Sequence, residues 1–175
     1  MKKLIQFIGY TLLILILIIS LLPKTDLYHE LEHRLKKENI VLSDEIPSDK
    51  FLQFSLENTL LYYNDINMAS FSRLDFLPLI FFNRVTVDNI KLQKAMQMFL
   101  PPKIDKITIT YSIIDPMKIY LVSKGQFGKA EGTINLKTRK LHIVLLPSVR
   151  MKRNHSNTLG MMKLINGHYI YDKVL

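Results

Sequence analysis

The longest uninterrupted hydrophobic pattern of the chain lies at its amino terminus. Residues 4–22 are 19 consecutive residues without a charge, preceded by Lys2 and Lys3 and followed by Pro23. At about 1.5 Å of rise per residue, a helix of this length spans roughly 28 Å, close to the hydrocarbon thickness of a bilayer. A cleaved signal peptide has a shorter apolar region and a small-residue cleavage site, which this run lacks. The pattern therefore predicts a transmembrane signal-anchor helix over residues 1–23, with the two lysines on the cytoplasmic side.

The segment after the anchor has helical spacing. Three leucines recur every fourth residue: Leu27, Leu31 and Leu35. They share one face of a helix predicted over residues 25–38. Residues 43–49 contain a proline and indicate a linker. We therefore expect a short juxtamembrane helix and a linker over residues 24–50.

From residue 51 onward, short segments alternate apolar and polar residues and are separated by turn residues. This period of two is typical of antiparallel strands with one buried face. The predicted strands cover residues 51–56, 58–63, 68–77, 85–92, 104–113, 118–122, 126–136, 139–146 and 168–175. Residues 94–100 are expected to form a short helix, and residues 150–160 a polar, basic loop. Residues 51–175 therefore predict one mainly β domain, built on an antiparallel sheet that the anchor places in the periplasm.

Cysteine and charge narrow the class of protein. The chain has no cysteine, which excludes disulfides and thiolate metal sites. Residues 1–100 carry 11 basic and 11 acidic side chains, whereas residues 101–175 carry 13 basic and 4 acidic ones. The basic surplus indicates either a surface that meets an anionic partner or the ordinary solvation of exposed strand faces by lysine. Nucleic acid is not an expected partner, because the domain is exported.

One catalytic motif is present. His29-Glu30-Leu31-Glu32-His33 matches the H-E-x-x-H pattern of zinc metalloproteases, in which two histidines bind the metal and the glutamate activates a water molecule. If the leucine face packs inward, however, both histidines face water, where a catalytic zinc is not expected. We retain a zinc metalloprotease only as a minor alternative, and we expect no enzyme, no metal and no cofactor.

Two further groups are candidate binding residues. Gly128, Ala130 and Gly132 share one face of a predicted strand and form a strip of small side chains. Such a strip indicates either a bent strand or a groove for an acyl chain or a partner strand. Arg150, Lys152 and Arg153 form the most concentrated basic patch, which indicates either contact with an anionic surface or a solvated loop.

Several stretches resemble AsmA-like proteins and the type II secretion system protein N. They comprise residues 60–66, 76–83 and 85–92, the glycine-rich run Gly125, Phe127, Gly128 and Gly132, residues 134–136 and 141–148, and the aromatic end 167–171. The resemblance implies a protein anchored in the inner membrane, with a curved periplasmic β-sheet and no catalytic residues. It also implies a link to secretion machinery or to lipid traffic.

These observations lead to one function and two alternatives. The leading hypothesis is a non-enzymatic, membrane-anchored envelope protein, a subunit or assembly factor of a type II secretion or pilus-like system with envelope protein partners. The first alternative is an AsmA-like module that binds or transfers phospholipid. The minor alternative is the zinc metalloprotease.

Overall fold

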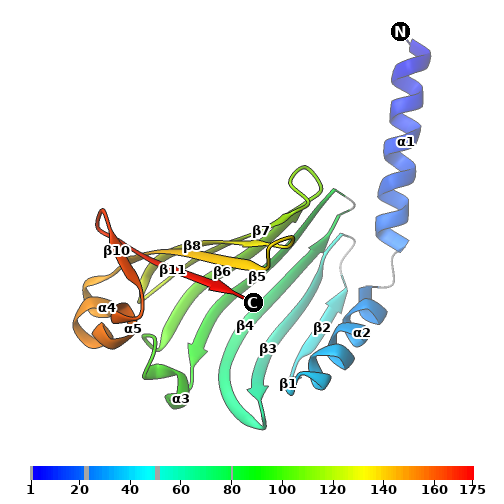
Figure 1. Cartoon of the computed structure of the whole chain (residues 1–175). Coiled ribbons are helices and arrows are strands. Elements are labelled where there is room, and N and C mark those ends of the chain that lie inside the picture. The colour runs from blue at the N-terminus through cyan, green and yellow to red at the C-terminus, as the bar shows by residue number, and fades with distance from the viewer. Residues whose placement is uncertain (1, 22–23, 50–51, 80) are drawn as a thin grey trace.

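The computed structural model describes residues 2–21, 24–49, 52–79 and 81–175. Helix α1 (Lys2–Leu21) projects away from the rest of the molecule, and α2 (Lys24–Lys37) follows it (Figure 1). Among the described residues, no helix is both long and apolar enough to cross a membrane. The transmembrane segment over residues 1–23 stays a prediction; its residues 1, 22 and 23, and the first residue of the predicted strand 51–56, lie outside the described residues.

The rest of the chain forms one open, antiparallel sheet. Its strands are β1 (Ile40–Ser43), β2 (Ile46–Asp49), β3 (Phe54–Tyr63), β4 (Ile66–Pro78), β5 (Phe82–Leu92), β6 (Lys103–Ser112), β7 (Lys118–Gly125), β8 (Gly128–Asn135), β9 (Lys140–Pro147), β10 (Lys163–Ile165) and β11 (His168–Val174). In the described part of the chain, this 11-stranded sheet has the order β1-β3-β4-β5-β6-β7-β8-β9-β11-β10, and β2 also pairs with β3. Figure 1 shows that the sheet is strongly curved. The prediction of a mainly β, antiparallel domain is confirmed.

In the described ranges, three short helices connect strands: α3 (Lys94–Gln97), α4 (Val149–Asn154) and α5 (Ser156–Gly160). The last two replace the loop expected over residues 150–160, so that prediction is wrong. Ser148 starts α4, because its hydroxyl accepts a hydrogen bond from the Met151 N–H at 3.1 Å. The linker expected over residues 43–49 is also wrong, since β1 and β2 both pair with β3 there. Pro47 is tolerated because this is an edge of the sheet.

One face of the sheet, which we call the inner face, carries apolar rows across neighbouring strands. The strand register aligns one row from β4 to β9: Leu74, Val87, Ile107, Ser123, Ala130 and Leu145. The next row consists of Phe76, Val85, Ile109, Leu121, Gly132 and Ile143. Since residues two apart on a strand point to the same side, these rows form one continuous surface.

The ladders of β3 to β6 are interrupted at the same level, beside Asn58, Ser72, Asn89 and Asp105. Asn58 and Asn89 both have φ of 54°, the left-handed region that asparagine tolerates better than most residues. These four interruptions form a line across the strands. On the two sides of this line, the alternation of inward and outward side chains is shifted by one residue, so that residues three apart, such as Val87 and Ile90, belong to the same core. Irregularities of this kind bend strands, and the line therefore lets the inner face follow the curve of the sheet.

Helix α2 covers the inner face at the β1–β3 end. Its Tyr28 is buried, stacks on Phe54 with ring centroids 5.2 Å apart, and donates a hydrogen bond to Glu45 at 2.7 Å. Burial, followed by the hydrogen bond to Glu45, raises the pKa of the Tyr28 hydroxyl. The leucine face of α2 does not pack inward at Leu31, which is 51% exposed. The flat ring of Tyr28 takes that position because it stacks on Phe54.

Candidate functional site

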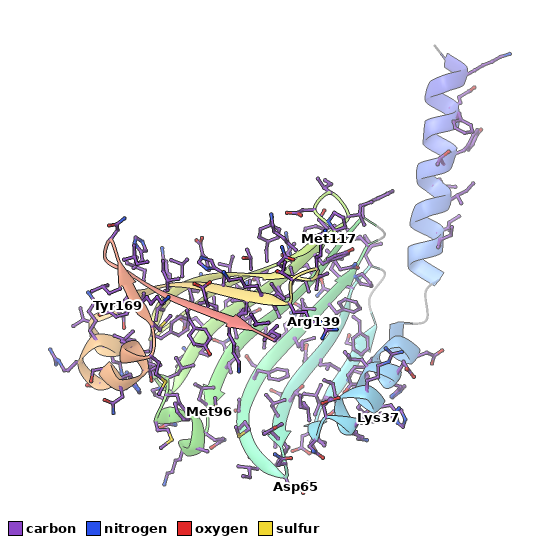
Figure 2. All side chains as sticks on the ribbon, viewed as in Figure 1. Lys37, Asp65, Met96, Met117, Arg139 and Tyr169 are labelled. Carbon is purple, nitrogen blue, oxygen red and sulfur yellow. The ribbon has the colours of Figure 1, made fainter. Side chains whose placement is uncertain are left out.

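A partly open apolar cavity of about 420 Å³ lies between the inner face of the sheet and the pair α4–α5. The cavity is lined by Leu100, Ile104, Ile107, Leu121, Ser123, Phe127, Ala130, Ile143, Leu145, Met151, Thr158, Met161, Met162 and Tyr171. Figure 2 places Tyr169 of β11 and Met96 of α3 at this end of the sheet, opposite Lys37 of α2. The volume lies in the range typical of small-molecule sites.

The lining offers almost no polar group to a ligand. None of the described lining residues carries a charge. Ser123 donates its hydroxyl proton to the Lys106 carbonyl at 3.3 Å, and Thr158 donates its own to the Phe99 carbonyl at 2.8 Å. Their donor capacity is therefore used within the protein. A ligand of this cavity must itself be apolar over the part that enters it, because a polar group would lose its hydrogen bonds to water.

The most buried part of the cavity lining consists of Phe127 and Met151, which tertiary packing brings together. Phe127, at the tip of the β7–β8 hairpin, is only 4% exposed. The hairpin is held on both sides: the Gln126 N–H donates to the Lys103 carbonyl at 3.0 Å, and the Phe127 carbonyl accepts from the Ser148 N–H at 2.8 Å. Met151 of α4, which is fully buried, closes the same part of the cavity.

The predicted small-residue strip lies on the inner face, but its three members differ in role. Ala130 lines the cavity, and Gly132 pairs with Leu121 and Ile143, which also line it. A Cβ at Gly132 would lie 3.1 Å from the His142 carbonyl oxygen. The strip therefore combines a cavity wall at Ala130 with tight backbone packing at Gly132.

Gly128 is required by the backbone. It has φ of +119°, and an added Cβ would lie 2.1 Å from the Leu146 carbonyl oxygen. Gly125 is similarly constrained, because its Cβ would lie 2.8 Å from the Ile104 Cα. These two glycines let the hairpin approach its neighbours closely, and this contact positions Phe127 in the cavity.

The predicted basic patch lies outside the cavity. Arg150, Lys152 and Arg153 are exposed residues of α4, whereas Met151 of the same helix faces the cavity. The basic patch and the cavity therefore lie on different faces of α4. The patch also lies at the end of the sheet away from α1 (Figure 1).

The H-E-x-x-H residues lie on the exposed side of α2. His29 and His33 are exposed, and Glu30 accepts a 2.8 Å hydrogen bond from Arg34. That hydrogen bond lowers the pKa of the Glu30 carboxyl. Within the described ranges, no group of three or more His, Cys, Asp or Glu side chains is placed to hold a metal ion.

The sequence reasoning missed the α4–α5 wall of the cavity. A signal was present, because Ser148 is a favourable helix N-cap and Met151 and Leu159 supply apolar residues in an otherwise polar segment. The basic side chains between them favoured a loop.

No protein-family model, curated protein or solved structure matches this chain. The resemblance to AsmA-like proteins and to the type II secretion system protein N thus stays a prediction from the sequence motifs.

Proposed function

We propose that this protein is a non-enzymatic, membrane-anchored lipid-binding protein. In this proposal, the amino-terminal helix holds the chain in the inner membrane, and the inner face of the periplasmic sheet binds an acyl chain of a membrane lipid. The observation that carries the proposal is the uncharged cavity between the sheet and α4–α5. No catalytic residue, cofactor or metal has a part in it.

The energy of binding would come from the burial of methylene groups. Each methylene transferred from water to an apolar surface contributes about 0.8 kcal/mol. About ten buried methylenes would contribute the roughly 8 kcal/mol of micromolar binding, and further methylenes would have to offset the cost of immobilising the chain. Because the cavity lining has few free polar atoms, selection would act on the apolar chain and not on the headgroup.

The membrane anchor is supported by the sequence of residues 4–22, which contains no charge. Lys2 and Lys3 precede it, as expected of the cytoplasmic side. With this orientation, the sheet lies in the periplasm, close to the lipid that the cavity would bind.

The test is to fill the cavity. The substitution Ala130→Phe places a ring in the lining, while Lys129→Phe, the matched control, adds the same ring at an exposed position of the same strand. We expect Ala130→Phe to weaken binding of a fluorescent fatty acid about tenfold, as the loss of contact with two methylenes predicts. Native mass spectrometry of the detergent-extracted full chain should show phospholipid on the wild type and on Lys129→Phe only.

Thermal unfolding of each variant separates loss of binding from loss of fold. If Ala130→Phe fails to fold, Met161→Asp serves as the second variant, because Met161 lines the cavity and is 67% exposed. Unchanged fatty-acid binding in a folded Ala130→Phe protein contradicts the proposal.

A second candidate is the subunit or assembly factor of a type II secretion or pilus-like system. The observation that favours it is the edge strand β10, in which Leu164 and Ile165 are 62% and 48% exposed. In the described part of the chain, β10 pairs only with β11, so that its other side is available for the addition of a partner strand. Envelope proteins that co-purify in fixed stoichiometry would support this function, whereas secretion that is unaffected by deletion of the gene would contradict it.

A further inference from the structure

Neighbouring loops along one edge of the sheet each display large apolar side chains. We call this edge the apolar rim; its members, all 45–91% exposed, are Phe81, Ile113, Ile114, Met117, Leu136 and Leu175. They come from the β4–β5, β6–β7 and β8–β9 loops and from the residue after β11. Apolar side chains that are exposed singly are ordinary, but a contiguous group marks an interaction surface.

Backbone hydrogen bonds join these loops into a row. The Ile113 N–H donates to the Phe81 carbonyl at 3.2 Å, and the Leu136 N–H donates to the Met117 carbonyl at 2.8 Å. At the end of the row, the Leu175 N–H donates to the Arg139 carbonyl at 2.8 Å. The apolar rim is therefore an ordered edge of the sheet, in which backbone hydrogen bonds link each loop to its neighbour.

The β6–β7 loop carries the most exposed member, Ile114, at 91%. Its acidic residue, Asp115, accepts a hydrogen bond from the Tyr120 hydroxyl at 2.6 Å and lies 3.2 Å from the Lys118 ammonium. The Ile114 N–H donates to the Ser112 hydroxyl at 3.2 Å. These bonds use the polar groups of the loop within the protein and leave the isoleucine side chain pointing outward.

Charge along the rim favours an anionic partner. Six basic residues lie in or beside these loops, namely Arg84, Lys118, Lys137, Arg139, Lys140 and Lys173, against two acidic ones, Asp115 and Asp172. Both acidic residues are already close to a lysine, Asp115 to Lys118 at 3.2 Å and Asp172 to Lys140 at 3.9 Å. Apolar side chains surrounded by basic ones are typical of proteins that insert into the interface of anionic bilayers.

The apolar rim lies on the side of the sheet from which α1 projects, which relates it to the membrane that α1 would anchor. In Figure 1, the β6–β7 loop rises on the same side of the sheet as α1 and reaches the level of the lower half of that helix. Figure 2 shows Met117 at this upper edge and Asp65 at the lower edge. A bilayer around α1 would thus meet the apolar rim first.

We propose that the apolar rim inserts into the interface of the same anionic bilayer that α1 anchors, so that the inner face of the sheet opens toward the membrane lipids. This inference rests on the proposed function for its anchor. Apolar side chains continue from the rim to the cavity, through a row of the inner face that includes Tyr111, Ile119 and Ile134. An acyl chain could follow this row without crossing water.

The absence of cysteine in the chain allows a direct test. Ile114→Cys on the rim and Met98→Cys on the opposite edge, where Met98 is 70% exposed, are each labelled with a fluorophore. The full-length proteins are placed in vesicles of phosphatidylethanolamine and phosphatidylglycerol that contain a spin-labelled lipid. We expect quenching at position 114 to be several-fold stronger than at position 98. We also expect iodide in the buffer to quench position 98 only.

The outcomes separate this inference from the proposed function. Equal lipid quenching at the two positions, or protection of position 114 from both quenchers, overturns the rim contact. Fatty-acid binding is measured on the same samples: a quenched rim without such binding upholds the rim and refutes the lipid site. Failure of both proteins to enter vesicles refutes the anchor and the rim contact together.

Discussion

At the scale of single residues, short contacts decide which side chains the sheet accepts. Gly128 illustrates this, because its φ is +119° and an added Cβ would lie 2.1 Å from the Leu146 carbonyl oxygen. In sequence, Gly128 and Gly132 are equivalent members of one strip. In the structure, the first serves the backbone of a hairpin and the second packs tightly against β9.

Asp75 makes the stability of the fold depend on pH. It lies on β4 and accepts hydrogen bonds at 2.7 Å from Arg73 and from the fully buried Ser55. Burial raises its pKa, but the hydrogen bonds from Arg73 and Ser55 outweigh that effect and lower it below the ordinary 3.8. The carboxylate therefore adds stability above pH 3.8, and this stability is lost as the pH falls through the lowered pKa.

We expect Asp75→Asn to lower the free energy of unfolding by about 1 kcal/mol at pH 7, because a charge-assisted hydrogen bond becomes a neutral one. At a pH below the folded-state pKa, the difference from the wild type should shrink. Urea unfolding of the full chain in detergent at both pH values measures this. Asp65→Asn, at an exposed hairpin tip, is the control, and an equal effect of both variants would argue against the Asp75 hydrogen bonds as the cause.

At the scale of elements, the line of interrupted ladders across β3 to β6 shapes the sheet. A strand with strict alternation would turn Ile90 outward, yet Ile90 is 7% exposed and belongs to the core. The change of phase requires positive φ at positions 58 and 89, and asparagine adopts this conformation with less strain than most residues do. The bend therefore depends on residues that the alternating pattern alone treats as ordinary strand positions.

Substitutions at Asn89 test this bend. We expect Asn89→Val to destabilise the protein by about 1–2 kcal/mol, because a β-branched residue is strained at positive φ. Asn89→Gly should stay close to the wild type, since glycine has no such strain. Thr86→Val, on the same strand, controls for the change of side chain. Thermal unfolding curves of the three variants provide the measurement, and a stable Asn89→Val protein would show that the positive φ is not required.

At the scale of the whole molecule, the proposal joins an anchor, a curved sheet and a lipid-exposed rim. The anchor has the simplest test. Leu13 and Leu17 are exposed on α1, and Leu31 is exposed on α2. An arginine near the centre of a membrane helix costs about 2.5–3.5 kcal/mol by insertion scales.

We expect the wild type to remain in the membrane pellet after washing with high salt and with alkaline carbonate. The double variant Leu13→Arg/Leu17→Arg should move to the supernatant, whereas Leu31→Arg, which adds a charge outside the anchor, should not. Release of the wild type by either wash would refute the anchor.

The features that depend on near neighbours could be predicted from the sequence. Alternation over residues 51–175 predicted an antiparallel sheet, and the segments from 68–77 to 139–146 each correspond to a strand of the structure or to the short helix α3. Helix α2 was predicted within one or two residues of its ends. These features are local because the period of side-chain direction is set by the backbone of the element itself.

The remaining features depend on which distant surfaces meet in the folded chain. The inward face of α2 depends on Tyr28 finding the ring of Phe54, about 25 residues away in sequence. The cavity needs β6, the β7–β8 hairpin, β9 and α4–α5 together, and the apolar rim needs loops that only the register aligns. No local pattern contains these contacts, so the sequence offered Ala130 as a candidate groove residue but could assign neither the α4–α5 wall of the cavity nor the rim.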